Sequence, residues 1–279
     1  MKKIVSIIYS FENVEKIADY SIKLARDLNR ELEFLHATES ENIHWDPTLT
    51  KYNSLSNVAE SENNLLVKER ERILQKLLHV KKVSLDYDYP VHFTVVPGSV
   101  SVVVKMLCER DDVEMVIAPF TTKNKMDVVV AEMIDDLDLP VYTFPLDEEY
   151  HKIKSIVYAS DYQKQDVKVL KRIARLAKKF TASVTVFHVL KLNEFDAELK
   201  KNGLQEMVNK KIDLNDMKVE QEKAGSPAKG IRRFTQKSYA DLVVLLKQNK
   251  NFFKEIFGRS TTREILNDID TPVLIYHQK

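Results

Sequence analysis

The residues best suited to chemistry lie near the C-terminus, in the stretch Gly258-Arg-Ser-Thr-Thr262. An apolar run at 242–246 precedes this stretch and an amphipathic segment at 263–269 follows it, which predicts a strand, a loop and a helix. The first N–H groups of a helix have no partner inside it, and the helix dipole favours an anion there. With the hydroxyls of Ser260 and Thr261, this loop is suited to bind phosphate.

The same residues have a purely structural interpretation. Thr261-Thr-Arg-Glu264 is a capping box, in which Thr261 caps the helix and Glu264 reaches back to the cap. Capping and phosphate binding can coexist. Three lysines of the loop, Lys247, Lys250 and Lys254, form either a solvated face or a rim that attracts phosphate.

Signatures of catalysis and of metal binding are missing from the sequence. It has no G-x-S-x-G, no Walker lysine loop and no H-E-x-x-H. His36 and His188 occupy equivalent strand ends without carboxylate or cysteine neighbours at ligand spacing, which favours packed side chains over metal ligands. We therefore expect no catalytic residues, no metal and no enzymatic activity.

Composition sets the class of protein. The chain has 279 residues, of which 44% are hydrophobic and 30% charged, and this length favours two domains. A formal charge of +1 gives no global electrostatic reason to expect nucleic acid or an anionic membrane as partner. Cys108, the single cysteine, cannot form an internal disulfide, so a reducing cytoplasm is the expected compartment. No apolar run approaches the roughly 18 residues of a membrane span.

Apolar strands alternate with helical patterns along the chain. Alternation of this kind predicts βαβ units, a parallel sheet and a doubly wound α/β layer with helices on both faces. In the first half, strands are expected at 4–9, 32–37, 91–96, 113–118 and 140–144, and the first helix at 14–28.

The second half of the chain repeats the first. Ile156-Val-Tyr-Ala-Ser160 matches Ile4-Val-Ser-Ile-Ile8, and Val186-Phe-His188 matches Phe34-Leu-His36. The pattern predicts two tandem domains, residues 1–147 and 153–279, joined by a short charged linker.

Ligands of doubly wound sheets lie beyond the carboxyl ends of the strands, where the strand order reverses. This rule places Asp161, His188 and the loop after Leu246 on one rim of the second domain. Asp161 also has a plain interpretation as a turn residue before a helix.

In these features the chain resembles tandem universal stress proteins over nearly its full length. The resemblance rests on Asp161 after the strand at 156–160, on Val186-Phe-His-Val189, on Ala240-Asp-Leu-Val-Val244 and on Gly258-Arg-Ser-Thr-Thr262. It implies five parallel strands and four helices per domain, the fold called adenine-nucleotide alpha-hydrolase-like. In nucleotide-binding members a G-x2-G-x9-G-[S/T] loop wraps the ATP phosphates. The first-strand Asp and the backbone that ends the second strand hold the adenosine.

The chain departs from the family loop at its glycines. Leu246 and Asn249 fall on the first two glycine positions, Arg259 falls on the third with Gly258 one place early, and Ser260 keeps the hydroxyl position. A Cβ at such positions blocks the approach of backbone N–H groups to phosphate.

The first domain departs further, with Tyr9 at the Asp position and no glycine in its loop at 119–126. The resemblance therefore implies an ATP or AMP site in the second domain only. Its residues would be Asp161, Val189, Asn249, Gly258, Arg259, Ser260 and Thr261.

The leading functional hypothesis is a cytoplasmic regulatory or binding protein of this family. A nucleotide-free interaction scaffold is the main alternative, because of the lost glycines, and a slow ATP hydrolase is the third. The end strands at 141–144 and 273–276 are natural edges for antiparallel pairing, either within the chain or in a homodimer.

Overall fold

The structure is a computed structural model of the whole chain. It describes residues 2–8, 11–38, 89–97, 111–120, 137–190, 196–214, 217–247 and 268–278, with positions 68, 71–73, 75–76, 79, 99, 109, 130, 133–135 and 264–266. Contacts divide the chain into two compact units, Met1–Ile117 and Ala118–Lys279. Each unit is described by itself.

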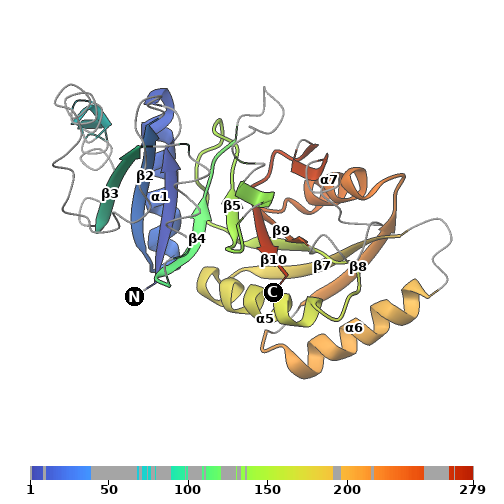
Figure 1. Cartoon of the computed structure of the whole chain (residues 1–279). Coiled ribbons are helices and arrows are strands. Elements are labelled where there is room, and N and C mark those ends of the chain that lie inside the picture. The colour runs from blue at the N-terminus through green and yellow to red at the C-terminus, as the bar shows by residue number, and fades with distance from the viewer. Residues whose placement is uncertain are drawn as a thin grey trace. The chain divides into compact units, whose positions relative to one another are not determined.

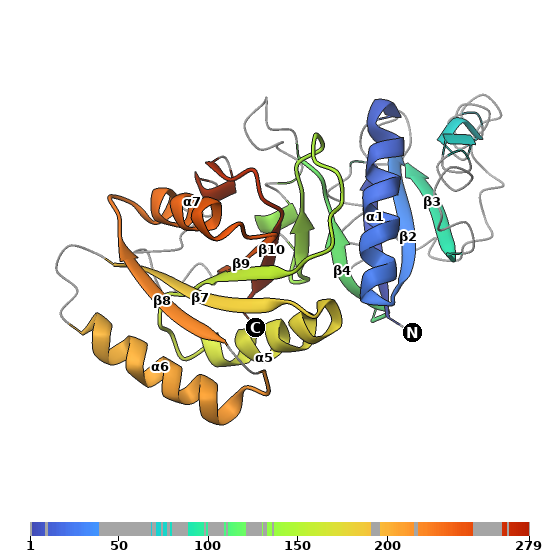
Figure 2. The same cartoon turned by 180° about the vertical axis from the view of Figure 1, so that it is seen from behind.

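The first unit contains four parallel strands in the order β3-β2-β1-β4. Their bounds are β1 (Lys3–Ile8), β2 (Glu31–Thr38), β3 (Val91–Pro97) and β4 (Val113–Ile117). A short 3-10 helix (Phe11–Asn13) leads into α1 (Val14–Leu28), which lies along β1 and β2 in Figures 1 and 2. The helix covers the predicted range and buries a single apolar face, as its periodicity requires.

The second unit contains six strands in the order β5-β10-β9-β6-β7-β8. The strands are β5 (Val141–Thr143), β6 (Ser155–Ala159), β7 (Ser183–Leu190), β8 (Lys218–Lys223), β9 (Leu242–Lys247) and β10 (Val273–His277). Its helices are α5 (Asp166–Phe180), α6 (Ala197–Lys211) and α7 (Pro227–Ser238). In both views α5 and α6 lie on one side of β7 and β8 and α7 lies on the other. The five strands from β10 to β8 are all parallel, which confirms the doubly wound α/β fold.

Strand β8 is an element that the sequence did not predict. Its sequence, Lys-Val-Glu-Gln-Glu-Lys, has one buried apolar side chain, Val219. The strand pairs in parallel with β7 and lies at the end of the strand order, where polar side chains are tolerated on both faces. The side chain of Gln205 on α6 also holds it, because Oε1 of Gln205 accepts from the Val219 N–H (3.1 Å).

The two end strands form an antiparallel pair, as predicted from their sequences. Tyr142 of β5 lies opposite Leu274 of β10. On its other side β5 follows the residues after β4, since the Ala118 N–H donates to the Tyr142 carbonyl (2.9 Å) and the Phe120 N–H to the Phe144 carbonyl (2.9 Å). Because β5 pairs with β10, the boundary between the two compact units falls at Ile117, before β5. The predicted domain limits, 1–147 and 153–279, instead follow the sequence repeat.

The first elements of the two halves are separated by a constant number of residues. Helices α1 and α5 are both 15 residues long and begin 152 positions apart. Strands β2 and β7 have the same length and the same separation. Both helices end at a residue with left-handed backbone, Asn29 (φ 51°) and Thr181 (φ 56°). Within the described part of the chain, no helix is long and apolar enough to span a membrane.

Candidate functional site

The predicted residues Asp161 and Val189 both lie beyond Ala159 and Phe187, the last residues that pair between β6 and β7. The register pairs Ala159 with Phe187, and the Ser160 N–H then donates to the Phe187 carbonyl (2.8 Å). Main-chain groups of alternate residues point to the same side of a strand, so those of Val189 face the β6 side just past the last ladder bond. Asp161 follows Ser160 at this level. This end of the sheet, the rim, thus carries the Asp161 carboxylate and the main-chain groups of Val189.

The order of strands reverses at this same place. Strand β6 has β7 on one side and β9 on the other, and the chain reaches β9 only after it has built β8. Ligands of open parallel sheets bind at such a reversal. The predicted phosphate loop starts immediately after Lys247, the last residue of β9. Its predicted site residues, Asn249, Gly258, Arg259, Ser260 and Thr261, lie outside the described residues.

A buried carboxylate, Asp166 at the start of α5, fixes the turn that carries Asp161. It accepts from the Tyr158 hydroxyl (2.8 Å), the Ser160 hydroxyl (2.5 Å) and the Gln163 N–H (3.1 Å). Burial raises the pKa of Asp166, while these hydrogen bonds oppose that shift. Burial, with the nearby Asp166 charge, raises the pKa of Tyr158 well above its usual value, so the phenol stays a donor.

Tyr162 places an aromatic ring across the rim. Its backbone is left-handed (φ 59°), an uncommon state for a bulky residue, and its N–H donates to Oγ of Ser160 (3.0 Å). The ring stacks on His188, with centroids 4.2 Å apart, and the hydroxyl donates to Oε1 of Gln221 (3.0 Å). The side chain of Tyr162 therefore links the ends of β6, β7 and β8.

The two histidines at strand ends are structural, as the sequence indicated. Nδ1 of His188 lies 2.8 Å from the Ser160 carbonyl, and Nδ1 of His36 lies 2.7 Å from the Ile8 carbonyl. Both rings are buried. Among the described residues, no group of three His, Cys, Asp or Glu side chains is placed to hold a metal ion.

Lys247 is not part of a solvated face, contrary to one of the two interpretations of its sequence. Its Nζ donates to Oδ1 of Asp135 (2.8 Å) and to the Ile134 carbonyl (2.5 Å) in a largely buried contact. Nε2 of His277 donates to the same carbonyl (2.8 Å), and burial lowers the pKa of His277. These donors satisfy a carbonyl of the helical residues 133–135. Lys250 and Lys254 lie outside the described residues.

Sequence reasoning missed Tyr162 and Asp166. An Asp in the first turn of a helix is common and carries no signal by itself. A signal was present in the repeat, because the position 152 residues before Asp166 is the apolar Val14. A buried position that changes from Val to Asp indicates that the second rim has acquired a polar role.

The comparisons with known proteins support the family resemblance. Residues 152–277 match the model of the Universal stress protein family. The chain is similar to the structure of a universal stress protein from Archaeoglobus fulgidus DSM 4304 (15% identity, 99% of this chain and 98% of that chain covered, TM-score 0.68). It is also similar to a putative universal stress protein from Pseudomonas aeruginosa UCBPP-PA14 (13% identity, 99% and 93% covered, TM-score 0.58).

A third similar structure is the cytoplasmic domain of a prokaryotic cation chloride cotransporter (11% identity, 98% and 94% covered, TM-score 0.58). No curated protein sequence matches the chain. At these identities the solved structures establish the fold over the whole chain. The residues that match the family model, 152–277, include the rim.

Proposed function

Taking residues 152–277 as a universal stress protein domain, we propose that this chain is a stress-response binding protein that holds an adenine nucleotide, ATP or AMP, at the rim of that domain. Asp161 and the main chain of Val189 would hold the adenosine. Helix-terminal amides and hydroxyls in the loop after β9 would hold the phosphates. The loop residues assigned to this role are Asn249, Gly258, Arg259, Ser260 and Thr261.

The observation that carries the proposal is that Asp161 and Val189 both lie beyond the last paired residues of β6 and β7, beside the strand reversal. The carboxylate and the main-chain groups past the ladder are of the types that bind ribose hydroxyls and base edges. The Asp166 network supports the assignment further, because hydrogen bonds from Ser160 and Gln163 to Asp166 hold the turn at Ser160–Gln163 in place. A turn fixed in advance loses little conformational entropy when a ligand binds.

Thermal unfolding with millimolar ATP or AMP tests this proposal. A ligand at a hundred times its Kd stabilises the native state by about 2.7 kcal/mol, so the melting temperature should rise measurably. Asp161→Ala should abolish the rise. Asp196→Ala, which removes an exposed carboxylate beside α6, should retain it. A wild-type chain that shows no rise, or an Asp161→Ala variant that keeps it, would contradict the proposal.

A second candidate, an interaction scaffold without nucleotide, is favoured by Tyr162. The chain's own ring already occupies the rim, stacked on His188 and hydrogen-bonded to Gln221. The Tyr162→Ala variant separates the candidates when each variant is compared with its own ligand-free melting temperature. If ATP stabilises Tyr162→Ala but not the wild type, the ring closes the rim and the wild-type chain is a scaffold that does not hold the nucleotide. If ATP stabilises neither, the scaffold is the better description.

The proposal is for binding without catalysis. His188, a potential base beside the rim, is buried, stacked and bonded to the Ser160 carbonyl. We expect phosphate release from ATP to stay at the level of a protein-free blank. Release above the blank in the wild type that is lost in Ser260→Ala would instead support a slow hydrolase.

A further inference from the structure

Charge is strongly segregated along the chain. Residues 152–279 hold 26 Lys and Arg against 15 Asp and Glu, a formal charge of +11, whereas residues 1–151 hold 17 against 27, a charge of −10. The expectation of no nucleic-acid partner rested on the total of +1, in which these two charges cancel. The second domain, considered alone, is strongly basic.

A large share of that positive charge lies on α5. Lys168, Lys171, Arg175 and Lys178 recur three or four residues apart, and all four are exposed. At roughly 3.6 residues per turn this spacing places them on one side of the helix. Only one acidic residue occurs in α5, and this residue, Asp166, is buried in the rim network.

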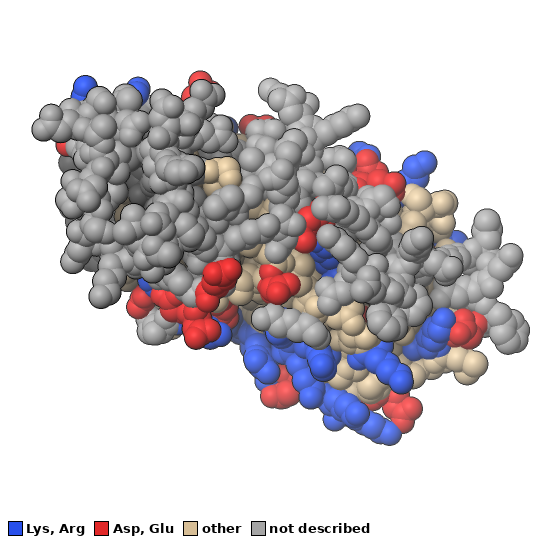
Figure 3. Space-filling model, in the orientation of Figure 1, with Lys and Arg blue, Asp and Glu red and all other residues tan. Residues whose placement is uncertain are grey.

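These four residues, with Lys164, Arg172 and Lys179, form a surface that we call the basic face of α5. All seven side chains are exposed and fall within an arc of about 120° around the helix axis. At about 1.5 Å per residue the face is roughly 22 Å long. Figure 3 shows Lys and Arg gathered in the lower part of the view, where Figure 1 places α5 and α6.

Much of this charge has no protein partner. Lys178 is paired with Asp213, and the Arg172 guanidinium lies 5.4 Å from the ring centroid of Tyr276. Within the part of the chain that the structure describes, no ion pair is formed by Lys168, Lys171 or Arg175. Repulsion along such a face is relieved when an anionic partner binds.

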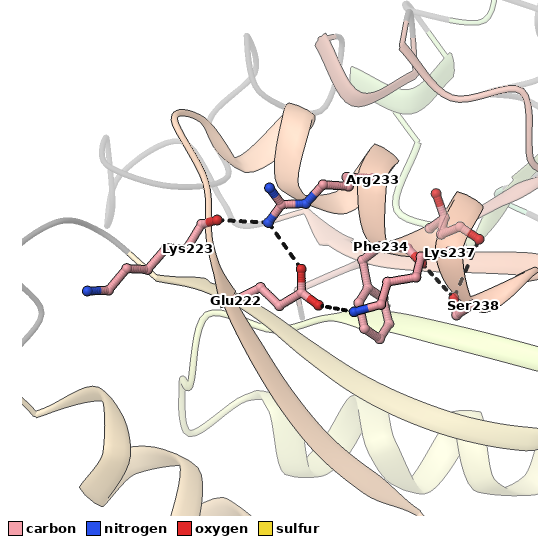
Figure 4. A network of polar contacts seen from close by, with 7 residues as sticks. Glu222, Lys223, Arg233, Phe234, Lys237 and Ser238 are labelled. Carbon is pink, nitrogen blue, oxygen red and sulfur yellow. Dashed lines mark hydrogen bonds and ion pairs between the residues drawn. The ribbon is translucent and has the colours of Figure 1, made fainter.

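Several cations on the other helices of the same unit pair with acidic side chains. On α6, Lys200 pairs with Asp196 (2.9 Å) and Lys210 pairs with Glu206. Two cations of α7, Arg233 (3.0 Å) and Lys237 (2.9 Å), pair with Glu222 of β8, which lies between them in Figure 4. The basic face of α5 is therefore a local feature of one helix and does not merely reflect the overall charge of the domain.

We propose that the basic face of α5 binds the phosphate backbone of double-helical DNA. Regularly spaced cations along a helix are the electrostatic footprint of a nucleic-acid partner. The face carries no aromatic side chain on which unpaired bases could stack, which disfavours single strands. It also carries no hydroxyl or amide to read a 2′-OH, which removes a reason to prefer RNA.

A lipid surface is a poorer match for the same face. Membrane-surface helices combine basic residues with large apolar side chains that enter the lipid. Among the described residues, the exposed large hydrophobic side chains are Leu199 on α6 and Tyr239 after α7, and neither lies on α5. Cations without an apolar anchor bind by charge alone, which predicts binding that is independent of sequence and weakened by salt.

The test measures fluorescence anisotropy of a labelled DNA duplex of mixed sequence with the full-length chain at several salt concentrations. If four phosphates are contacted, the slope of log K against log salt should be about −3.6. The triple variant Lys168→Glu, Lys171→Glu, Arg175→Glu should weaken binding at least tenfold and make the slope shallower by about 3, or about 1 per lost contact.

A matched variant on α6 changes the total charge by the same amount. Lys201→Glu, Lys210→Glu, Lys211→Glu should weaken DNA binding by less than about threefold, because most of these lysines already pair with neighbouring acids. Circular dichroism and thermal unfolding check that both variants fold. If the α5 variant unfolds, the corresponding Gln substitutions replace it.

Several outcomes would overturn the proposal. These are an absence of DNA binding by the wild-type chain at low salt and an equal loss of affinity in the two triple variants. Tighter binding to single-stranded RNA, to duplex RNA or to vesicles rich in phosphatidylserine would assign the face to another partner. Self-association at low salt that only the α5 variant suppresses would assign it to the acidic half of a second copy.

Discussion

Helices α1 and α5, with the strands beside them, are two versions of one arrangement. In both, a buried histidine bonds to the carbonyl that ends the first strand, through His36 with Ile8 and His188 with Ser160. The rim positions differ, since Ile8 and Val14 of the first version correspond to Ser160 and Asp166 of the second. The shared features are therefore requirements of the fold. The polar rim is an addition that the fold does not need.

The outer faces of the two helices differ in the same way. Helix α1 carries Asp19 and Asp27 at the positions where α5 carries Lys171 and Lys179. In α1, Asp19 pairs with Lys23 (2.7 Å), so the charges of the helix are satisfied internally. Since both helices fold and pack, the charge of α5 is not explained by stability.

The largest effect is expected when a residue of the second rim is replaced by its counterpart in the first. Asp166→Val introduces the residue found at Val14, but it leaves the buried hydroxyls of Tyr158 and Ser160 without their acceptor. Each unsatisfied group costs roughly 1–3 kcal/mol, so the free energy of unfolding, measured with urea, should fall by about 3 kcal/mol.

The double variant Ser160→Ile, Asp166→Val is the matched control. It removes one of the two orphaned hydroxyls but also the acceptor of the Tyr162 N–H, so its free energy of unfolding should be close to that of the single variant. A single variant that loses less than about 1 kcal/mol would show that the network does not hold the rim.

A second test compares the shared histidines. His36→Leu and His188→Leu each leave a strand-end carbonyl without its ring N–H, which should cost about 1–2 kcal/mol by urea unfolding. His188→Leu should cost about 0.5–1.5 kcal/mol more, because the stacking of Tyr162 is also lost. Equal losses in the two variants would mean that Tyr162 contributes nothing to stability.

The helix ends give a smaller contrast. Thr181 is β-branched and adopts φ 56°, whereas Asn29 adopts φ 51° and tolerates that conformation well. Thr181→Gly should therefore raise the free energy of unfolding by about 0.5–1 kcal/mol, and Asn29→Gly should change it by about zero. A Thr181→Gly variant that is less stable than wild type would show that the Thr side chain makes a compensating contact.

The smallest expected effect is a pH dependence confined to the second rim. The pKa of Asp166 is raised from 3.8 by burial, so the native state binds this proton more tightly than the unfolded state. The stability that Asp166 contributes is then fully present below pH 3.8 and is lost as the pH rises through its folded pKa. The free energy of unfolding of wild type minus that of Asp166→Asn should therefore fall with rising pH. A difference that rises with pH over this range would show that folding lowers the pKa of Asp166 and does not raise it.

Most of the fold could be predicted because local patterns specify it. The apolar periodicity of 14–28 gives the limits of α1, and the end strands were recognised as an antiparallel pair. Strand β8 escaped because a polar edge strand with Val219 as its buried apolar residue has no alternating pattern. Its position depends on pairing with β7 and on Gln205, which local sequence does not reveal.

The candidate site could be predicted only in part. The rule for parallel sheets placed Asp161 and His188 on one rim, since it depends on strand order alone, whereas Val189 was assigned from the family resemblance. The partner of Lys247 is Asp135, 112 residues earlier in the chain, and no local pattern encodes that contact. The roles of Tyr162 and Asp166 depend on burial and on backbone conformation, which appear only when the turn is built.

The pairing of β5 with β10 has a consequence for how this chain can be divided. A fragment that begins at residue 151 keeps the residues matched by the family model but loses β5, so the N–H and carbonyl groups along one side of β10 lose their partners. Two such fragments can satisfy each other through an antiparallel β10–β10 pair about a twofold axis. In light scattering we expect the fragment to be a dimer. Because the two halves are joined in one chain, each chain supplies its own β5 to cover β10. A separate domain would have to take that strand from another copy, so the covalent connection limits assembly.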